Sequence, residues 1–475
     1  MIEAILITLV CIITWVYLRK KKKIKQPYKL PAGRRGWPVI GDSLRWYKSV
    51  SGSYPPQFAH QQASRYGKIF SCSLFGKWTV VSTDSTFNRF VMQNEGKLFK
   101  SNYPKSFTDL VGKNGVITVH GDQHRKLHGI ASNLLRIDKL NGRFFERIQL
   151  VMLRIFDEFR DQQVVLLQDV CRKVAISLMV NQLVGVSSGS EISEMAQLFS
   201  HFVDGCLSVP IYFPGSSYYT AIKARKKIIR KIEERIKKCD SSGFEENGVL
   251  GRLVNEENLD NEAIKDFILN LLFAGNETTA KTMLLAVYFL THSPKAMHQI
   301  LEEHHNIRHT FVGDDEFLTW QHYKAMPFTQ CVIDETLRIG GIAIWLMREA
   351  KEDVVYQEYV IPKGWPVIPF LSAVHLDENL YKGALSFNPW RWMDSEYQEK
   401  RNWRNSCMYA PFGGGPRFCP GADLARLQIA LFLHCFLTKF RWTQLKEDRL
   451  SFFPSARLVN GFQIRLTTIC AYNAS

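Results

Sequence analysis

The longest regular pattern of apolar and polar positions in the chain runs from residue 260 to residue 290. Apolar side chains recur there at the spacing of one helix face, as Phe267, Leu271 and Ala274 show. At about 1.5 Å per residue, this helix would be about 45 Å long. A polar cluster, residues 274–279 with the sequence Ala-Gly-Asn-Glu-Thr-Thr, interrupts the apolar stretch. The pattern predicts one long buried helix with polar groups near its centre.

Other stretches show either the helical spacing or the alternation typical of strands. Helical patterns cover residues 165–184, 221–238 and 422–442, and the last of these is apolar on almost every face. Residues 68–82, 354–368 and 452–466 combine strand-like runs with turn residues and predict short hairpins. Together these patterns predict a mostly α fold with small β-sheets.

The first 18 residues are apolar except for one charge, that of Glu3. As a helix they would span about 27 Å, close to the bilayer core of the endoplasmic reticulum. Five basic residues, 19–23, follow, whereas a cleaved signal peptide places its basic residues first. This order predicts an uncleaved, single-pass transmembrane signal anchor, with the rest of the chain in the cytosol. A buried core helix is the alternative.

Composition and charge narrow the class of protein. The 475 residues are 46% hydrophobic, and no stretch after residue 50 has the composition of an interdomain linker. We therefore expect the anchor at residues 1–18, a basic, proline-containing linker at residues 19–38 and one catalytic domain at residues 39–475. The formal net charge of +16 favours an anionic membrane or an acidic partner protein, because the sequence shows no nucleic-acid-binding motif.

The ten cysteines are scattered, without a Cys-x-x-Cys pair, which argues against zinc sites, iron–sulfur sites and a disulfide framework. Cys419 differs from the others, because it follows a glycine-rich loop and precedes the apolar pattern at 422–442. Glycines let the backbone approach a flat ligand closely, and a helix start favours thiolate over thiol. A small buried hydrophobe is the usual role of a lone cysteine. The combination around Cys419 instead predicts a cysteine-ligated haem.

The residues around Cys419 satisfy the pattern Phe-x-x-Gly-x-Arg-x-Cys-x-Gly at every fixed position: Phe412, Gly415, Arg417, Cys419 and Gly421. On this motif the chain resembles the cytochromes P450, a family of haem-thiolate monooxygenases. The resemblance implies the cytochrome P450 fold, with Cys419 as the axial ligand of the iron in haem b (iron protoporphyrin IX). Arg417 would bind a haem propionate, and Phe412 would shield the thiolate. A thiolate ligand favours cleavage of the O–O bond.

The polar cluster at residues 274–279 matches the oxygen-activation motif of the same family. Taken alone, such a cluster in a helix is more often a hydrogen-bonded kink than a catalytic site. The resemblance implies that Glu277 and Thr278 form the acid–alcohol pair that delivers protons for dioxygen activation. Ala274 and Gly275 would leave room for O2 over the haem.

Further basic positions match places where the family binds haem propionates. His124 fits the first position of a pair on one helix, whereas His128 stands where arginine is usual. A histidine is neutral part of the time near pH 7, so this second contact is open. Arg348, ten residues after Arg338, fits another such place. For the two histidines, a surface helix end is the alternative.

Glu335 and Arg338 are neighbours on a predicted helix because they are three residues apart. Apolar flanks favour burial of this pair. The two residues match the Glu-x-x-Arg motif of the family, and Arg391 matches the third member of that structural triad. We expect these three residues to serve folding and not chemistry.

The candidate pocket residues are apolar and offer few hydrogen-bonding groups, which favours a bulky lipophilic substrate. They are Phe267, Leu271, Ile342, Ala343, Ile344, Trp345 and Val459.

Over residues 30–468 the chain resembles plant steroid and triterpenoid hydroxylases, above all the brassinosteroid C-22 hydroxylases, with segments 111–121 and 339–348 most alike. The resemblance implies insertion of one atom of O2 into a sterol side chain at the endoplasmic reticulum membrane. Electrons would come from NADPH through the acidic flavoprotein NADPH–cytochrome P450 reductase.

Several alternatives remain open at the level of the sequence. A triterpenoid or specialised-steroid hydroxylase shares the same motifs. A haem-thiolate isomerase or dehydratase would need no reductase, and the intact Glu277–Thr278 pair argues against it. A membrane protein that only binds lipid or haem would show no turnover.

Overall fold

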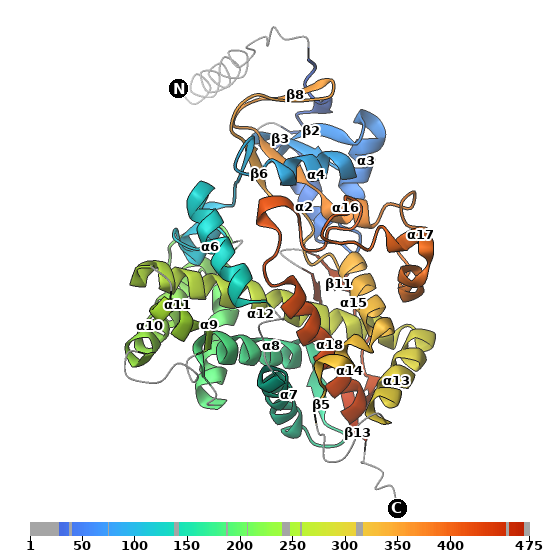
Figure 1. Cartoon of the computed structure of the whole chain (residues 1–475). Coiled ribbons are helices and arrows are strands. Elements are labelled where there is room, and N and C mark those ends of the chain that lie inside the picture. Colours follow the sequence, from blue (N-terminus) through green and yellow to red (C-terminus); the bar gives the residue numbers. More distant parts are fainter. Residues whose placement is uncertain are drawn as a thin grey trace, which may run out of the picture.

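The computed structural model of the protein describes residues 28–37, 40–74, 76–136, 142–186, 189–206, 208–239, 248–256, 259–309, 317–452 and 456–469. Helices form most of the molecule, and the largest sheet and helices α2–α4 form one end of it (Figure 1). The expectation of a mostly α fold with small β-sheets is therefore confirmed.

The helices are, in chain order, α2 (Ser43–Val50), α3 (Gln57–Tyr66), α4 (Ser85–Gln93), α5 (Lys105–Val111), α6 (Gly121–Leu134), α7 (Gly142–Asp157), α8 (Leu167–Val184), α9 (Gly189–Cys206), α10 (Ser217–Cys239), α11 (Gly248–Glu256), α12 (Asn261–Thr291), α13 (Pro294–His309), α14 (Trp320–Lys324), α15 (Pro327–Ile339), α16 (Leu371–His375), α17 (Ser395–Gln398) and α18 (Ala422–Lys439). Two short 3₁₀ turns are η3 (Pro389–Met393) and η4 (Gly415–Arg417).

The strands are β1 (Gly33–Arg34), β2 (Ile69–Leu74), β3 (Lys77–Ser82), β4 (Phe99–Ser101), β5 (Val164–Leu166), β6 (Arg348–Ala350), β7 (Val354–Tyr356), β8 (Tyr359–Ile361), β9 (Pro366–Pro369), β10 (Phe440–Gln444), β11 (Leu450–Ser451), β12 (Arg457–Leu458) and β13 (Gln463–Thr468).

The largest sheet has six strands in the order β1-β2-β3-β9-β6-β4. Strands β2 and β3 are the antiparallel hairpin expected at residues 68–82. Strand β9 then joins β3 in parallel and β6 antiparallel. Because β6 begins at Arg348, this sheet fixes the backbone of one residue of the candidate site.

The second half of the expected linker is held by the domain. Strand β1 pairs in parallel with β2. Lys29 donates its backbone N–H to Glu358 O at 2.9 Å and accepts from Val360 N at 3.0 Å. Residues 29–34 thus belong to the folded body, which begins earlier than the boundary at residue 39 that the sequence suggested.

The expected anchor at residues 1–18 and linker residues 19–27 lie outside the described part of the chain. Within the described part, no single helix combines the length and apolar composition needed to cross a membrane. Helices α8 and α9 reach that length and composition only as a pair, with a bend of 110° between them.

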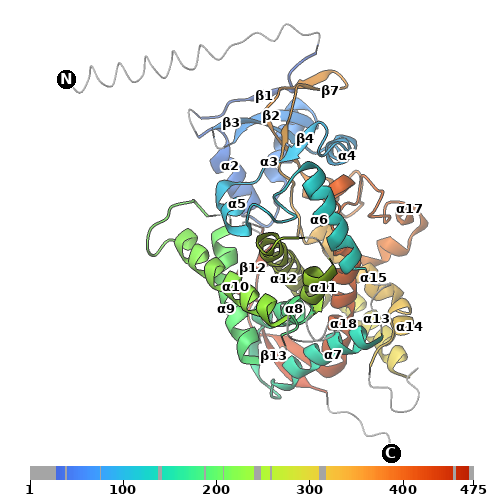
Figure 2. The ribbon, with the colours of Figure 1, turned by 60° about the vertical axis from the view of Figure 1, so that its left-hand side comes forward.

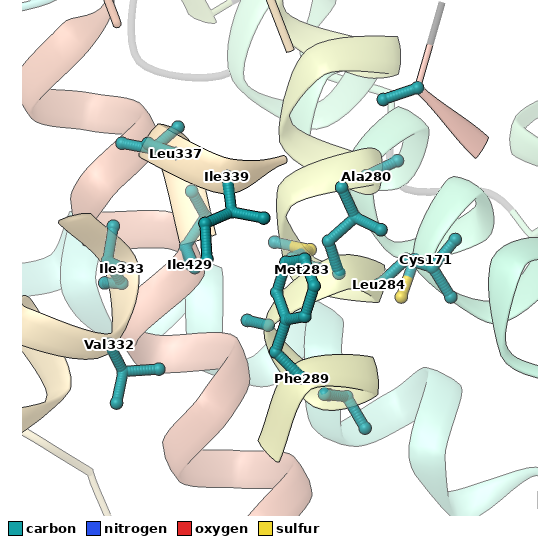
Figure 3. Close-up of a cluster of buried hydrophobic side chains, with 14 of the residues drawn as sticks. Cys171, Ala280, Met283, Leu284, Phe289, Val332, Ile333, Leu337, Ile339 and Ile429 are labelled. Atoms are coloured by element: carbon teal, nitrogen blue, oxygen red, sulfur yellow. The ribbon is translucent and has the colours of Figure 1, made fainter. Parts of the chain in front are cut away.

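Helix α12 is the central helix, and it confirms the long helix expected at residues 260–290. Asp260 caps its N-terminus by accepting a hydrogen bond from Ala263 N at 2.7 Å. Figure 2 looks almost along α12 and shows α5, α8, α10 and α11 near it. Its C-terminal half packs in a buried cluster that includes Met283 of α12, Leu337 of α15 and Ile429 of α18 (Figure 3). This packing fixes α12 relative to α18, the helix that follows the cysteine loop (residues 412–421).

Several predictions of secondary structure are wrong in detail. The mixed, glycine-dotted sequence at 101–120 predicts a loop, but this stretch contains α5. The run after residue 364 becomes β9 of the large sheet, while β7 and β8 form the hairpin. Residues 452–466 do not form one hairpin, because β12 pairs with β11 and β13 pairs with β10 and β5. Alternation of apolar and polar residues indicates a strand, but it does not show which other strand it pairs with.

Candidate active site

The loop before α18 places Cys419 three residues before Ala422, the first residue of that helix. Its backbone N–H donates to Phe412 O at 3.0 Å, which closes the loop on itself. Gly415 has a φ of +63°, and a Cβ there would lie 2.1 Å from Met92 O at the end of α4. Only glycine meets both demands. Gly421 is the N-cap residue of α18, and its backbone N–H donates to the Cys419 sulfur.

The electrostatics of Cys419 differ from the expectation for a helix start. Although the residue as a whole is only partly buried, burial of its sulfur raises the pKa of the Cys419 thiol to about 11. The N–H of Gly421 lowers this pKa but does not outweigh burial. The protein alone therefore keeps a thiol at neutral pH, and a bound metal cation is needed to hold the thiolate.

Aromatic rings pack beside the cysteine loop. The ring of Trp403 stacks on Phe418 with centres 5.5 Å apart, and it lies 5.1 Å from the ring of Phe412. The guanidinium of Arg404 lies 4.5 Å from the centre of the Trp403 ring. The ring of Phe412, a member of the cysteine loop, thus packs against Trp403, which no sequence pattern identified.

Arg417 and Arg348 come from separate elements and converge on one carboxylate, that of Glu95. Arg417 Nε donates to Glu95 Oε1 at 2.7 Å, and Arg348 Nε lies 2.6 Å from Glu95 Oε2. Arg417 also donates to the backbone oxygens of Ile117 and Val119. All three charged side chains are less than 10% exposed. The structure brings the two predicted arginines together, whereas Glu95 carries no motif that would have identified it.

Two histidines of α6 lie close to this cluster. Burial, aided by the charge of Arg417, lowers the pKa of His124 to about 3, so this residue is neutral. His128 Nε2 lies 2.7 Å from Phe418 O, one residue before Cys419. Because a carbonyl oxygen only accepts, Nε2 must carry the proton. His128 therefore binds the cysteine loop through Nε2.

The polar cluster of α12 is divided between two faces of the helix. Ala274 and Thr278 are exposed, and Thr278 Oγ1 donates to Ala274 O at 2.7 Å. A Cβ on Gly275 would lie 2.4 Å from Met179 Cε of α8. Gly275 therefore allows α8 and α12 to pack closely, and the open surface of this cluster belongs to Ala274 and Thr278.

Glu277 lies in an ion-paired cluster on the α8 side of α12. Its Oε1 is 2.8 Å from Lys281 Nζ and 3.5 Å from Arg172 Nη2. Burial alone would raise the pKa of Glu277, but the charges of Lys281 and Arg172 lower it overall. The carboxylate is therefore ionised at neutral pH.

A small cavity adjoins Glu277 between α8, α9 and α12. Its volume of about 30 Å³ suffices for about two water molecules. Asn276 also lines it, and Asn276 Oδ1 is buried without a hydrogen-bond partner among the described residues. A polar cavity of this size is suited to ordered water. Sequence reasoning identified Glu277 but neither of its ion-pair partners nor this cavity.

The N-terminal half of α12 holds the segment between α5 and α6. Asn270 accepts a hydrogen bond from Ile117 N at 3.1 Å and donates to Val111 O at 2.6 Å. Asp266, one turn earlier, accepts from the backbone of the same segment. Because Ile117 O binds Arg417, this segment joins α12 to the cysteine loop.

The structure brings the three predicted triad residues into one buried network. Glu335 accepts two hydrogen bonds from Arg338, at 2.8 and 3.0 Å, and one from Arg391 at 3.1 Å. Trp392 Nε1 donates a further bond to Glu335 at 3.0 Å. Asp334, the preceding residue, binds arginines of α18 and of the chain before it in a second buried network. No sequence motif pointed to this second network.

Of three further predicted pocket residues, two are buried in the hydrophobic core and one lies on the surface. Phe267 and Leu271 are 0% and 4% exposed and belong to the hydrophobic core around the first half of α12. They share a helix face with Ala274, as predicted, but α9 and α10 supply part of the core that covers this face near the N-terminus of α12. Val459 is 47% exposed and follows β12.

The other predicted pocket residues form the segment 342–345 between α15 and β6, which is buried at Ile344 and partly exposed elsewhere. Ala343 packs in the small cluster that contains Met92, the residue against which the cysteine loop lies. Trp345 instead turns toward Trp46 of α2, with ring centres 5.3 Å apart. Only part of this segment therefore faces the cysteine loop.

The side chains of this site fit a haem. Arg348 is 3% exposed, and its hydrogen bonds within the described part of the chain use only Nη1, which donates to Met347 O at 2.9 Å. Its buried Nε faces Glu95 as an ion pair without a hydrogen bond. The terminal nitrogens of a guanidinium suit carboxylate oxygens, such as those of a propionate. The Cys419 sulfur is a ligand that haem iron accepts.

Comparisons with known proteins agree with this fit. The family model described as Cytochrome P450 matches residues 31–463. Abietadienol/abietadienal oxidase of Pinus taeda is 43% identical over 451 residues, which are 94% of this chain and 92% of that protein. Steroid (22S)-hydroxylase of Oryza sativa subsp. indica is 37% identical over 449 residues, 93% of this chain and 88% of that protein. A cholesterol 22-monohydroxylase of Trigonella foenum-graecum is 36% identical over 463 residues, 94% of either chain.

A solved structure shows the same fold. Cyanobacterial CYP120A1 with bound retinoic acid superposes with a TM-score of 0.81 at 25% sequence identity, over 93% of this chain and 100% of that one. The family match, the relatives and the solved structure each extend over nearly the whole chain. The chain belongs to the cytochrome P450 family.

Proposed function

We propose that the protein is a membrane-bound monooxygenase that oxidises a polycyclic terpenoid or steroid with electrons from NADPH. Family membership supports the monooxygenase activity, the haem-thiolate cofactor and a redox partner that supplies electrons. The observation that carries the proposal is the combination of the Cys419 loop with two buried arginines and an exposed Thr278 on α12. These are the groups needed to hold a haem and to supply protons beside it.

In this proposal each group has a separate task. Cys419 ligates the iron, and Arg417 and Arg348 bind the propionates. His124, which is neutral, offers a ring nitrogen next to Arg417. When bound, the haem supplies the chemistry that activates O2. The chain supplies the buried thiol, the fixed arginines and the open face of α12.

Glu277 and Thr278 supply protons from different faces of α12. Glu277 is ionised and adjoins a cavity with room for water, so it can exchange protons with solvent. The Thr278 hydroxyl donates to Ala274 O and is exposed on the face proposed for O2. A hydroxyl both donates and accepts, so Thr278 can pass on a proton without changing its own charge.

For the substrate, we propose a diterpenoid of the abietane type as the first candidate, since the abietadienol/abietadienal oxidase shares 43% identity with this chain. The second candidate is a sterol oxidised at C-22 of its side chain, as in brassinosteroid biosynthesis. Relatives with 36–37% identity that are named as 22-hydroxylases favour it. Both substrates are polycyclic lipophiles, in line with the apolar candidate pocket.

We also propose that the chain lies on the endoplasmic reticulum membrane, with residues 1–18 as anchor and the domain in the cytosol. The connection between α9 and α10 exposes Val209, Ile211 and Phe213 by 58–71%. Exposed apolar side chains of this kind suit a lipid surface.

Flotation with phospholipid vesicles tests the role of this connection. An Ile211→Ser/Phe213→Ser variant should float less than its parent. Equal flotation would contradict the role of this connection.

The partner proposed for electron supply is NADPH–cytochrome P450 reductase. The net charge of +16 and the half-exposed Arg404 beside the cysteine loop suit an acidic flavoprotein.

The test of the proposed function uses the full chain in membranes with this reductase, NADPH and ¹⁸O2. Abietane diterpenoids and sterols are offered separately, and products are identified by mass. We expect one labelled oxygen per oxidation in one of the two substrate classes.

The outcome of this assay separates the alternatives. Product that forms without reductase and carries no label would indicate an isomerase or dehydratase. No turnover of any lipophile by haem-loaded protein would favour a protein that only binds lipid or haem.

A further inference from the structure

Glu95 is a buried carboxylate that the proposed reaction does not use. It lies in the turn after α4, with its side chain 4% exposed. Ser101 donates to its Oε1 twice, through the backbone N–H at 3.2 Å and through Oγ at 3.3 Å. These bonds fix the carboxylate from the β4 side.

Both predicted propionate-binding arginines turn the same atom, Nε, toward this carboxylate. Arg417 Nε lies 2.7 Å from Oε1, and Arg348 Nε lies 2.6 Å from Oε2. Because a guanidinium is planar and rigid, holding it at Nε sets the direction of its terminal nitrogens. The backbone oxygens of Ile117 and Val119 hold Arg417 at a second edge. Glu95 therefore sets how the two guanidinium groups lie relative to each other.

The charges lead to the same conclusion. Arg417 and Arg348 carry two positive charges at one buried place, and mutual repulsion and desolvation disfavour that arrangement. One carboxylate between them offsets part of this cost. Neutral His124 does not add to the positive charge. The site can thus form before an anionic ligand arrives and still retain an excess positive charge to attract one.

We propose that Glu95 is a positioning residue for the haem, which acts by orienting Arg417 and Arg348 toward the two propionates. This inference rests on the propionate role proposed for the two arginines. It assigns Glu95 a task beyond structural stability, because the ion pair would control how firmly the haem is held and how readily its iron is reduced.

The test compares Glu95→Gln with a matched control, Glu349→Gln. Glutamine retains an oxygen for Ser101 but removes the charge. Glu349 lies next to Arg348 on β6 and pairs with Lys100 at 2.9 Å, outside the arginine cluster. In haem-loaded protein, we expect Glu95→Gln to release haem to apomyoglobin about tenfold faster than the parent. We also expect a higher midpoint potential of the iron, because a nearby negative charge is lost. Glu349→Gln should match the parent in both.

A purely structural Glu95 would lower the unfolding temperature and leave haem release and midpoint potential at their parent values. That result, or either readout unchanged, would overturn the inference. If Glu95→Gln does not fold, Ser101→Ala takes its place, since it removes one hydrogen bond and keeps the charge. Faster haem release from Ser101→Ala would support the inference, and an unchanged rate would contradict it.

The same experiment keeps this inference apart from the proposed function. A parent protein without a haem-thiolate spectrum would contradict the proposed function itself. A parent with that spectrum, together with an unaltered Glu95→Gln variant, would contradict only the role of Glu95.

Discussion

At the scale of single residues, α12 separates an acid from an alcohol that are neighbours in the sequence. Glu277 turns toward Lys281 and Arg172, whereas Thr278 is exposed and bonded to Ala274 O. Successive helix residues point in directions about 100° apart. An ionised carboxylate beside a cavity with room for water and a hydroxyl at the open face therefore occupy adjacent positions without competing for the same space.

Replacing Thr278 with alanine should uncouple electron use from product formation. The variant retains every group proposed to hold the haem, so it should bind haem normally and consume NADPH. Product per NADPH should fall at least about tenfold, with peroxide formed instead. The matched control is Thr438→Ala, which removes a hydroxyl bonded in the same way to the carbonyl four residues earlier in α18. Unchanged coupling in Thr278→Ala would remove Thr278 from the proton path.

Glu277 should make the stability of the protein depend on pH in a defined direction. Its pKa is lowered in the folded protein, so its contribution is present above the unfolded value of about 4.3 and is lost as the pH falls through the lower folded value. The Glu277→Gln variant should be about 1–3 kcal/mol less stable at pH 7. Denaturant unfolding at several pH values measures this. A difference that persists unchanged in acid would contradict the ionised pair.

Site residues that belong to a sequence motif could be named from the sequence. Residues whose role depends on contacts with distant parts of the chain could not be assigned that role from the sequence. Cys419, Arg417 and Glu335 belong to spaced patterns whose chemistry limits the residue types. Glu95 and His128 show their partners only in the folded chain. The start of α18 lowers the pKa of the Cys419 thiol, as expected, but burial, which a sequence does not quantify, outweighs this effect and raises the pKa.

At the scale of elements, the cysteine loop is held by three neighbours. Met92 of α4 lies against Gly415, and His128 of α6 donates to Phe418 O. The segment before α6 binds Arg417 and is itself bound by Asn270 of α12. The position of the sulfur therefore depends on helices far from it in the sequence.

Replacing His128 with phenylalanine should loosen the cysteine loop. The change leaves Phe418 O without its donor, at a cost of about 1–3 kcal/mol. Haem-loaded protein should convert faster from the thiolate-ligated to a non-thiolate form on mild heating, as followed by the spectrum of the reduced carbon monoxide complex. Ser132→Ala is the control, because it leaves the His128 Nε2 bond intact. Equal conversion rates for His128→Phe and parent would show that this bond does not hold the loop.

Replacing Glu335 with alanine should impair folding. It leaves the buried Arg338 and Arg391 without their carboxylate, which costs about 3–5 kcal/mol. We expect little soluble protein and little bound haem. Glu396→Ala is the control, since its pair with Lys400 is exposed. Normal haem content in Glu335→Ala would show that the network is dispensable.

At this scale, helices were easier to predict than strand partners. The pattern at residues 260–290 is long and periodic, and α12 follows it almost to the residue. Short strands such as β9 and β13 are defined by partners distant in sequence, so their alternation alone led to the wrong hairpins.

At the scale of the whole molecule, the fold places a cysteine loop, a long helix and a small sheet around one site. The comparisons show the family over nearly the full chain, while the names of relatives divide between diterpenoid and steroid oxidation. The sequence alone favoured the steroid. A pocket lined by apolar residues does not distinguish two polycyclic lipophiles, because neither its composition nor the family motifs fix the position that is oxidised.

The central claim, that Cys419 holds the haem iron through its sulfur, is tested most directly by the absorbance spectrum of the reduced carbon monoxide complex. Full-length parent protein should show the red-shifted Soret band of a thiolate-ligated haem, and Cys419→Ala should lack it. Survival of that band in Cys419→Ala, or its absence from haem-loaded parent protein, would contradict the account.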